Sequence, residues 1–141
     1  MPEKRTKERA RKAKREGKAP TTQAGEFVRE EIEHVREGKH GARSAKQAIA
    51  IGLSKARRAG VKLPPPKKGR TSARTRKSAA SAYRAGQSGA RKKPSPKRSR
   101  ATLRALKREP RSTVSRKALA RQARRSYRRP QSSRRRKRAS A

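Results

Sequence analysis

Cysteine and tryptophan are absent from this chain of 141 residues, and its aromatic side chains are limited to Phe27, Tyr83 and Tyr127. Without cysteine, disulfides, thiolate metal sites and thiol nucleophiles are excluded. No apolar run approaches the roughly 20 residues that span a bilayer, and the first residues lack the apolar segment of a secretory signal. These absences predict a soluble cytoplasmic protein with no membrane partner.

Large apolar side chains are also scarce, because Ile, Leu, Val and Phe together number only 13 residues. This share lies well below the roughly 20% at which a highly charged chain is expected to be disordered. Burial of so little apolar surface cannot offset a backbone-ordering cost of about 1–2 kcal/mol per residue. The expected fold class is therefore mostly α and largely disordered, with a short antiparallel helical hairpin flanked by basic low-complexity arms.

Positive charge is abundant: 47 Lys and Arg residues stand against nine Glu residues, which gives a formal net charge of +38. So much charge of one sign repels itself within a single chain. A nucleic acid relieves this repulsion, since each phosphate that a cation neutralises releases condensed counterions. The composition therefore predicts a nucleic acid as the partner.

The apolar and acidic residues are concentrated in one part of the chain. Nine of the 13 large apolar residues fall within residues 27–63, and five of the nine glutamates fall within residues 26–37. This distribution predicts four parts: a basic N-terminal arm (1–20), a helical hairpin module (21–62), a Pro-rich linker (63–70) and a basic, mostly disordered tail with latent helices (71–141). In the arm, without an apolar face, we expect only a nascent helix.

Two helices are expected in the hairpin module. Thr21 and Thr22 are N-cap candidates for the first helix, and Gly38 is placed to end it. Ser44 and Gln47 have the spacing of a capping box at the start of the second helix. Because only the short loop 38–43 joins the two helices, we expect them to form an antiparallel pair.

The apolar face of this hairpin is the expected site of self-association or of a protein partner. The hairpin has about 40 residues, near the size below which a chain needs oligomerisation, a disulfide or a metal to fold stably. This size suggests a homodimer. The glutamates of the first helix would repel phosphate, so this element is not expected to bind nucleic acid. The residues of this face are Phe27, Val28, Ile32, Val35, Ile49 and Leu53.

The nucleic-acid-binding residues are expected mainly beyond the hairpin. The sequence of residues 95–98, Ser-Pro-Lys-Arg, resembles a turn in linker-histone tails that presents two cations to the minor groove, although chance explains such a match more readily in this composition. Residues 134–138 form a run of five cations. The candidates are Arg57, Arg58, Lys67, Lys68, Arg70, Lys97, Arg98, Arg124, Arg125, Arg134, Arg135, Arg136, Lys137 and Arg138.

Residues 38–69, GKHGARSAKQAIAIGLSKARRAGVKLPPPKKG, resemble a segment of small, highly basic bacterial proteins. The segment from Thr21 to Glu31 resembles the same family, so the resemblance covers about residues 21–70. The family has no established function, and its members are often labelled DNA-binding. The resemblance implies a bacterial cytoplasmic setting and a role with nucleic acid, and it carries over no site residues.

Metal binding and catalysis are not expected. His34 and His40 have only glutamate neighbours in the sequence, and His40 is interpreted as a turn residue or a phosphate contact. No catalytic triad, buried acid pair or glycine-rich phosphate loop can be assembled from the sequence. We therefore expect no metal, no cofactor, no small-molecule substrate and no enzymatic activity.

The preferred hypothesis is a sequence-nonspecific, histone-like protein of the bacterial nucleoid that neutralises DNA and bridges it if the hairpin dimerises. Phosphate contacts carry no sequence information, and the chain has no recognised base-reading module. Two alternatives remain open. One is an RNA-binding or ribosome-associated protein, and the other is a protein-interaction adaptor anchored to nucleic acid by its tail. DNA is favoured over RNA as the partner.

Overall fold

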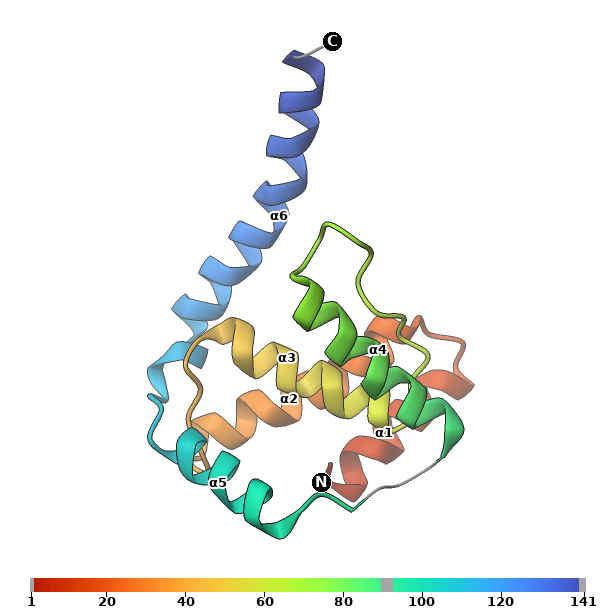
Figure 1. Cartoon of the computed structure of the whole chain (residues 1–141), viewed down its shortest axis with the longest axis vertical. Coiled ribbons are helices and arrows are strands. Elements are labelled where there is room, and N and C mark those ends of the chain that lie inside the picture. Colours follow the sequence, from red (N-terminus) through yellow and green to blue (C-terminus); the bar gives the residue numbers. More distant parts are fainter. Residues whose placement is uncertain (1, 90–92, 140–141) are drawn as a thin grey trace.

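The computed structural model describes the backbone of residues 2–89 and 93–139, and the side chains of these ranges up to Arg128. The described residues form helices that pack around α2 and α3, with α6 projecting away from the others (Figure 1). The helices are α1 (Lys4–Arg15), α2 (Pro20–Arg36), α3 (Ala45–Arg58), α4 (Ala73–Ser88), α5 (Pro96–Lys107), the 3₁₀ turn η1 (Ser112–Val114) and α6 (Arg116–Ala139).

The two helices expected between residues 21 and 62 are present as α2 and α3. The N-cap of α2 is Ala19 and Pro20 takes the first helical position, where its missing N–H costs nothing. The N-cap predicted at Thr21 or Thr22 is therefore wrong, since both residues lie inside the first turn. Helix α3 begins as predicted, because the Ser44 hydroxyl accepts a hydrogen bond from the Gln47 backbone N–H at 3.1 Å.

Gly52 allows α2 and α3 to approach closely. A Cβ atom at this position would lie 2.6 Å from the Cα of Val28, a distance that real Cβ atoms essentially never show. Ala45, Ala48 and Ala56 are also buried on α3, so its inner face consists largely of small residues. Small side chains thus bring the two backbones together, where large ones would separate them.

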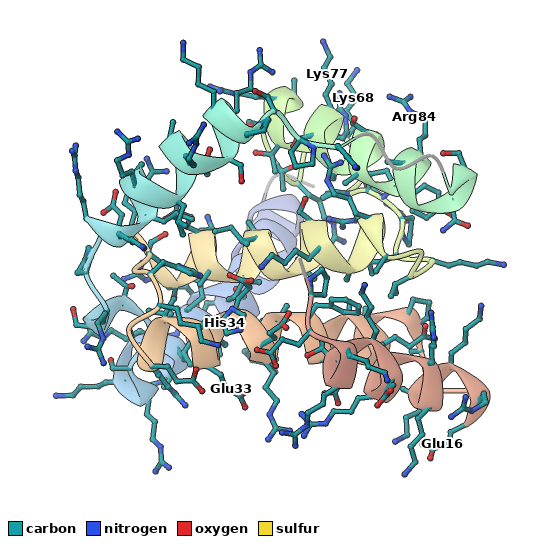
Figure 2. The ribbon with its side chains drawn as sticks, turned by 90° about the horizontal axis from the view of Figure 1, so that it is seen from below. Glu16, Glu33, His34, Lys68, Lys77 and Arg84 are labelled. Atoms are coloured by element: carbon teal, nitrogen blue, oxygen red, sulfur yellow. The ribbon has the colours of Figure 1, made fainter. Side chains whose placement is uncertain are left out.

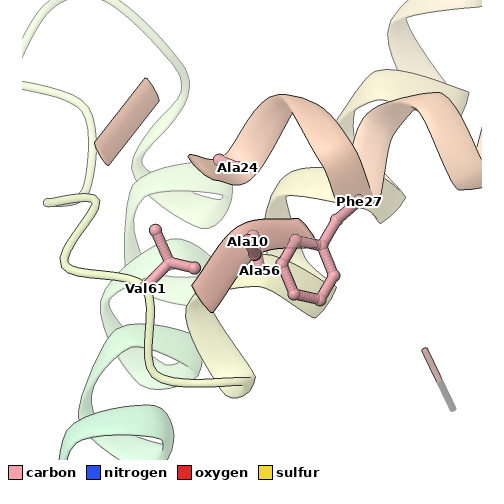
Figure 3. Close-up of a cluster of buried hydrophobic side chains, with 5 residues drawn as sticks. All are labelled: Ala10, Ala24, Phe27, Ala56 and Val61. Atoms are coloured by element: carbon pink, nitrogen blue, oxygen red, sulfur yellow. The ribbon is translucent and has the colours of Figure 1, made fainter. Parts of the chain in front are cut away.

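Helix α1 packs on this pair and completes its first apolar cluster (Figure 3). Ala10 is only 5% exposed and lies with Phe27 and Val61. Ala13 and Thr6 of α1 are also buried. The arm is therefore a packed helix, and its apolar face consists of alanine and threonine methyl groups. The cluster comprises Ala10, Ala24, Phe27, Ala56 and Val61, with Leu53 and Leu63 packed against it.

Helix α4 covers the other side of α3 through a similar contact. Ser72 caps it by accepting a hydrogen bond from the Thr75 N–H at 3.2 Å. Ala79 and Ala82 are its buried residues. A Cβ atom at Gly86 would collide with the carbonyl oxygen of Arg57, so glycine is needed where the two helices meet.

The segment between α5 and α6 is held against the end of α2 and the loop before α3. The N–H groups of Gly41 and Ala42 donate to the carbonyl oxygens of Leu106 and Pro110, at 2.8 and 3.0 Å. Val114 of η1 is fully buried, in a second cluster made by Val35, Ala42 and Ala48 with Ile32 packed against it. These contacts join parts of the chain that are about 70 residues apart.

The expected fold class is therefore wrong. The chain is mostly helical, but it is not a short hairpin with disordered arms, because α1, α4 and η1 pack on the hairpin and α5 and α6 are formed. The prediction counted only large apolar side chains, whereas buried alanines supply much of the core: Ala10, Ala13, Ala24, Ala42, Ala45, Ala48, Ala56, Ala79 and Ala82. Among the described residues, no helix is both long and apolar enough to cross a membrane.

Candidate nucleic-acid interface

The glutamates are confined to α1, α2 and the residues next to them, with the exception of Glu109. Seven of these eight glutamates form ion pairs with Lys, Arg or His residues between positions 4 and 55. The eighth, Glu30, accepts a hydrogen bond from the backbone N–H of Glu3 at 2.6 Å. The acids are therefore matched locally with cations of the same part of the chain.

The basic segment, residues 62–139, holds 30 Lys and Arg residues and a single acid, Glu109. Among the side chains that the structure describes, no Lys or Arg beyond Lys55 forms an ion pair. This positive charge is left for an external anion.

The cations of α4 and of the linker before it lie on one side of the molecule. In Figure 2, Lys68, Lys77 and Arg84 project from the side that bears α4, whereas Glu16 and Glu33 lie on the opposite side. All three cations are exposed. The molecule therefore presents a strongly basic side and a side on which acids and cations are mixed.

Helices α5 and α6 extend the basic surface. Helix α5 has no buried residue, and its Lys97 and Arg98 stand in the first turn after the N-cap Ser95. The compact turn considered for residues 95–98 is therefore a helix start, with Pro96 at the first helical position. On α6, four arginines spaced along one face line a shallow hollow: Arg121, Arg124, Arg125 and Arg128.

Most predicted phosphate contacts are exposed, and one is not. Arg57 is 7% exposed, and its guanidinium donates to the carbonyl oxygens of Leu63 and Pro64 at 3.1 and 3.3 Å. Desolvation by burial lowers the pKa of Arg57. This arginine fastens the start of the linker to α3, so we remove it from the interface. The exposed candidates are Arg58, Lys67, Lys68, Arg70, Lys97, Arg98, Arg124 and Arg125.

The side chains of Arg134, Arg135, Arg136, Lys137 and Arg138 lie outside those that the structure describes, although their backbone belongs to α6. Sequence reasoning also missed exposed cations on the described helices. Their signal was the latent helices expected in residues 71–141, whose periodicity was not used to place cations. The additional residues include Arg74, Lys77, Arg84, Arg100, Arg104, Arg121 and Arg128.

The face predicted for self-association lies inside the chain. Phe27 and Val35 are 1% and 0% exposed. Val28, Ile32, Ile49 and Leu53 are half-buried, and Ile32 and Leu53 pack against the two apolar clusters. The prediction treated the hairpin as isolated, whereas α1 and Val114 cover its apolar face. This surface is therefore part of the intramolecular core.

His40 is 9% exposed, which removes it from the expected phosphate contacts. It lies beside Glu31, a fully buried carboxylate of α2, together with His34 and Lys55. On the outer side of this group, a hydrogen bond from His34 lowers the pKa of Glu3. The positive charge of Lys39 lowers it further, and the two effects outweigh desolvation, which raises it. This group does not belong to the basic surface.

Residues 11–68 match a sequence family described as a family of unknown function (DUF6496). The match covers the last five residues of α1, all of α2 and α3, and most of the linker, and it ends before α4. No curated protein and no solved structure matches the chain.

Proposed function

We propose that the protein binds nucleic acid through the cations of the linker and of α4, α5 and α6, without reading its sequence. The observation that carries this proposal is the division of charge described above. Seven of the eight glutamates before residue 38 form ion pairs with cations between positions 4 and 55, while the described cations beyond Lys55 have no acidic partner. A polyanion is the partner that such a surface fits.

Duplex DNA of a bacterial nucleoid is the partner that we favour. Arginine outnumbers lysine by 29 to 18, and its guanidinium binds phosphate in a bidentate manner and enters narrow minor grooves. Helix α6 carries arginines along a projecting axis, and a major groove admits a helix. The only aromatic side chains beyond Phe27 are Tyr83 and Tyr127, which supports a duplex over a single strand read by base stacking.

The proposal is tested by two triple variants that remove the same amount of charge. The first carries Lys68→Gln, Lys77→Gln and Arg84→Gln on the basic side. The second is the matched control, with Lys4→Gln, Lys12→Gln and Lys18→Gln in α1 and directly after it. Each control lysine forms an exposed ion pair with Glu8 or Glu16, and exposed pairs contribute little to stability, about 0–1 kcal/mol.

Affinity for duplex DNA is measured by fluorescence anisotropy over a range of salt concentrations. If each lost cation contacts one phosphate, the basic-side variant reduces the magnitude of the log–log salt slope by about 2.7. The control variant leaves the slope close to that of the wild type. Equal losses in the two variants would show that net charge alone, and not this surface, determines binding. Duplex RNA and single strands of the same length, measured in parallel, test the choice of partner.

A further inference from the structure

A buried group of two histidines and one glutamate lies between α2, α3 and the loop that joins them. Glu31 is 0% exposed and His34 follows it at i+3 on α2. His40 comes from the loop. One nitrogen of each imidazole and one oxygen of the carboxylate all lie within 4.8 Å of one another. Unlike the exposed cations of the basic surface, this group is largely buried, and it plays no part in the proposed function.

The orientation of His40 follows from its contact with Gly41. Its Nδ1 lies 2.8 Å from the Gly41 carbonyl oxygen, which has no proton, so Nδ1 is the donor. In the neutral ring, Nε2 then carries a lone pair. This Nε2 lies 3.2 Å from Glu31 Oε2, a buried oxygen that receives no hydrogen bond. Two acceptors that face each other in a dry site are unfavourable unless a cation or a proton lies between them.

His34 is held in the same way from the outer side. Its Nε2 lies 3.2 Å from a carboxylate oxygen of Glu3, and its Nδ1 faces Glu31 Oε1, the oxygen that Lys55 contacts, at 3.9 Å. The backbone N–H of Glu3 is fixed in turn by Glu30 at 2.6 Å. Each histidine therefore donates outward, to a carbonyl or a carboxylate, and directs its other nitrogen toward Glu31. Metal-binding histidines are oriented by outer partners of this kind.

Lys55 provides a hydrogen bond to only one of the two oxygens of the Glu31 carboxylate. Its ammonium contacts Oε1, whereas Oε2 has no hydrogen-bond partner. A Zn²⁺ ion binds imidazole nitrogen and carboxylate oxygen at about 2.0–2.2 Å, which places tetrahedral ligands about 3.3 Å apart. The 3.2 Å between His40 Nε2 and Glu31 Oε2 matches this spacing.

We propose that Glu31, His34 and His40 form a binding site for Zn²⁺, with the Glu31 carboxylate, His34 Nδ1 and His40 Nε2 as the ligands. Two imidazoles and a carboxylate are a ligand set that zinc prefers, and three protein ligands leave one position for water. Glu3 and Glu30 add negative charge near the site and offset that of Lys55. The set disfavours Mg²⁺ and Ca²⁺, which prefer oxygen ligands.

Metal binding at this site would also affect how the basic segment is held against the rest of the molecule. His40 directly precedes Gly41 and Ala42, whose N–H groups hold Leu106 and Pro110. A metal on His40 would fix the conformation of this loop, and with it the position from which α5 and α6 extend. Bound Zn²⁺ is therefore expected to raise the thermal stability of the protein.

Zinc binding is measured on the untagged full-length chain by isothermal titration calorimetry. The expected result is one Zn²⁺ per chain, with no comparable binding of Mg²⁺. Two-bond ¹H–¹⁵N spectra of the histidine rings then test the geometry. Zn²⁺ should shift Nδ1 of His34 and Nε2 of His40. If Nε2 of His40 is already protonated and neither ring responds to Zn²⁺, a proton occupies the position and the proposal is overturned.

Variants separate the ligands from their surroundings. His34→Asn and Glu31→Gln should abolish 1:1 binding, and Glu3→Gln should weaken it by about tenfold or more, since Glu3 orients a ligand. Glu33→Gln is the matched control, because Glu33 lies on the same helix and pairs only with Arg29 at the surface. If Glu31→Gln does not fold, His34→Asn decides the test, since the His34 side chain is 15% exposed. Unchanged binding in His34→Asn would overturn the proposal.

Discussion

Glycine at two positions of the α2–α3 pair has opposite roles. Gly52 meets the backbone of Val28, where a Cβ atom would be 2.6 Å from the Cα atom. Gly25 lies on α2 with nothing within 4 Å of such an atom. Close packing therefore requires glycine at position 52, whereas at position 25 glycine only weakens the helix.

Gly52→Ala and Gly25→Ala should therefore change stability in opposite directions. Gly52→Ala forces the helices apart and should lower the free energy of unfolding by about 1–3 kcal/mol. Gly25→Ala should raise it by up to about 1 kcal/mol through helix propensity. Urea unfolding followed by far-UV circular dichroism measures both. A neutral or stabilising effect of Gly52→Ala would show that α2 and α3 are not in close contact.

Arg57 was predicted to contact phosphate because it is an arginine in a basic stretch, but it has a structural role instead. Its neighbour Arg58 is exposed, but Arg57 faces the start of the linker and donates to Leu63 and Pro64. No property of the Arg-Arg pair in the sequence distinguishes the two. The difference arises from the direction in which the chain leaves α3, which only the folded structure shows.

At the scale of elements, η1 anchors the C-terminal helices to the rest of the molecule. Helix α5 has no buried residue of its own. The hydroxyl of Thr113 donates to the Ala42 carbonyl at 2.8 Å, and Arg36 donates to the Val114 carbonyl at 3.3 and 3.4 Å. With Val114 fully buried, this short turn supplies the apolar part of the attachment.

Val114→Asp should therefore release residues 96–128 without unfolding α1 to α4, because it places an unpaired charge in the second apolar cluster. Hydrogen exchange is expected to become faster at Gly41 and Ala42, whose N–H groups hold the segment, and to remain unchanged at Ala56. Leu103→Asp is the control, since Leu103 is 44% exposed on α5. If exchange at Gly41 and Ala42 is unaffected, the segment is held by contacts other than Val114.

The second helix of the hairpin was predictable because its signals are local. Ser44 and Gln47 lie three residues apart and form the cap that their spacing predicts. The attachment of η1 was not predictable in this way. Val114 is an isolated apolar residue in a basic stretch, and its partners Val35, Ala42 and Ala48 are more than 60 residues away. Glu31, His34 and His40 are close in the sequence, but their burial and their contacts with Glu3 and Lys55 arise only in the fold, so sequence reasoning did not group them.

At the scale of the whole molecule, the composition led to a wrong prediction of the degree of order. The count of large side chains ignored alanine, which is buried where helices approach closely, as at Ala10 and Ala82. Each buried alanine removes little apolar area, but it also loses no side-chain entropy on folding. Helices that lack large apolar side chains therefore pack through a narrow face of buried alanines.

Binding should depend strongly on salt and very little on sequence. The chain has 30 Lys and Arg residues after Gly60, and contact with about ten phosphates gives a log–log slope near −9. Anisotropy titrations on duplexes of equal length and unrelated sequence measure both properties. A shallow slope, or a large preference for one duplex, would contradict nonspecific phosphate binding.

The concentration of acids in α1 and α2, away from the unpaired cations of α4, gives the molecule a permanent electric dipole moment. Lys68, Lys77 and Arg84 lie toward its positive end, and Glu16 and Glu33 lie toward the other (Figure 2). In the field of a polyanion this dipole experiences a torque that turns the α4 side forward before contact, so a larger share of encounters is productive. In the binding mode that we propose, the side that carries most of the glutamates faces away from the duplex. A coated duplex would then present a surface that attracts further DNA less than the α4 side does.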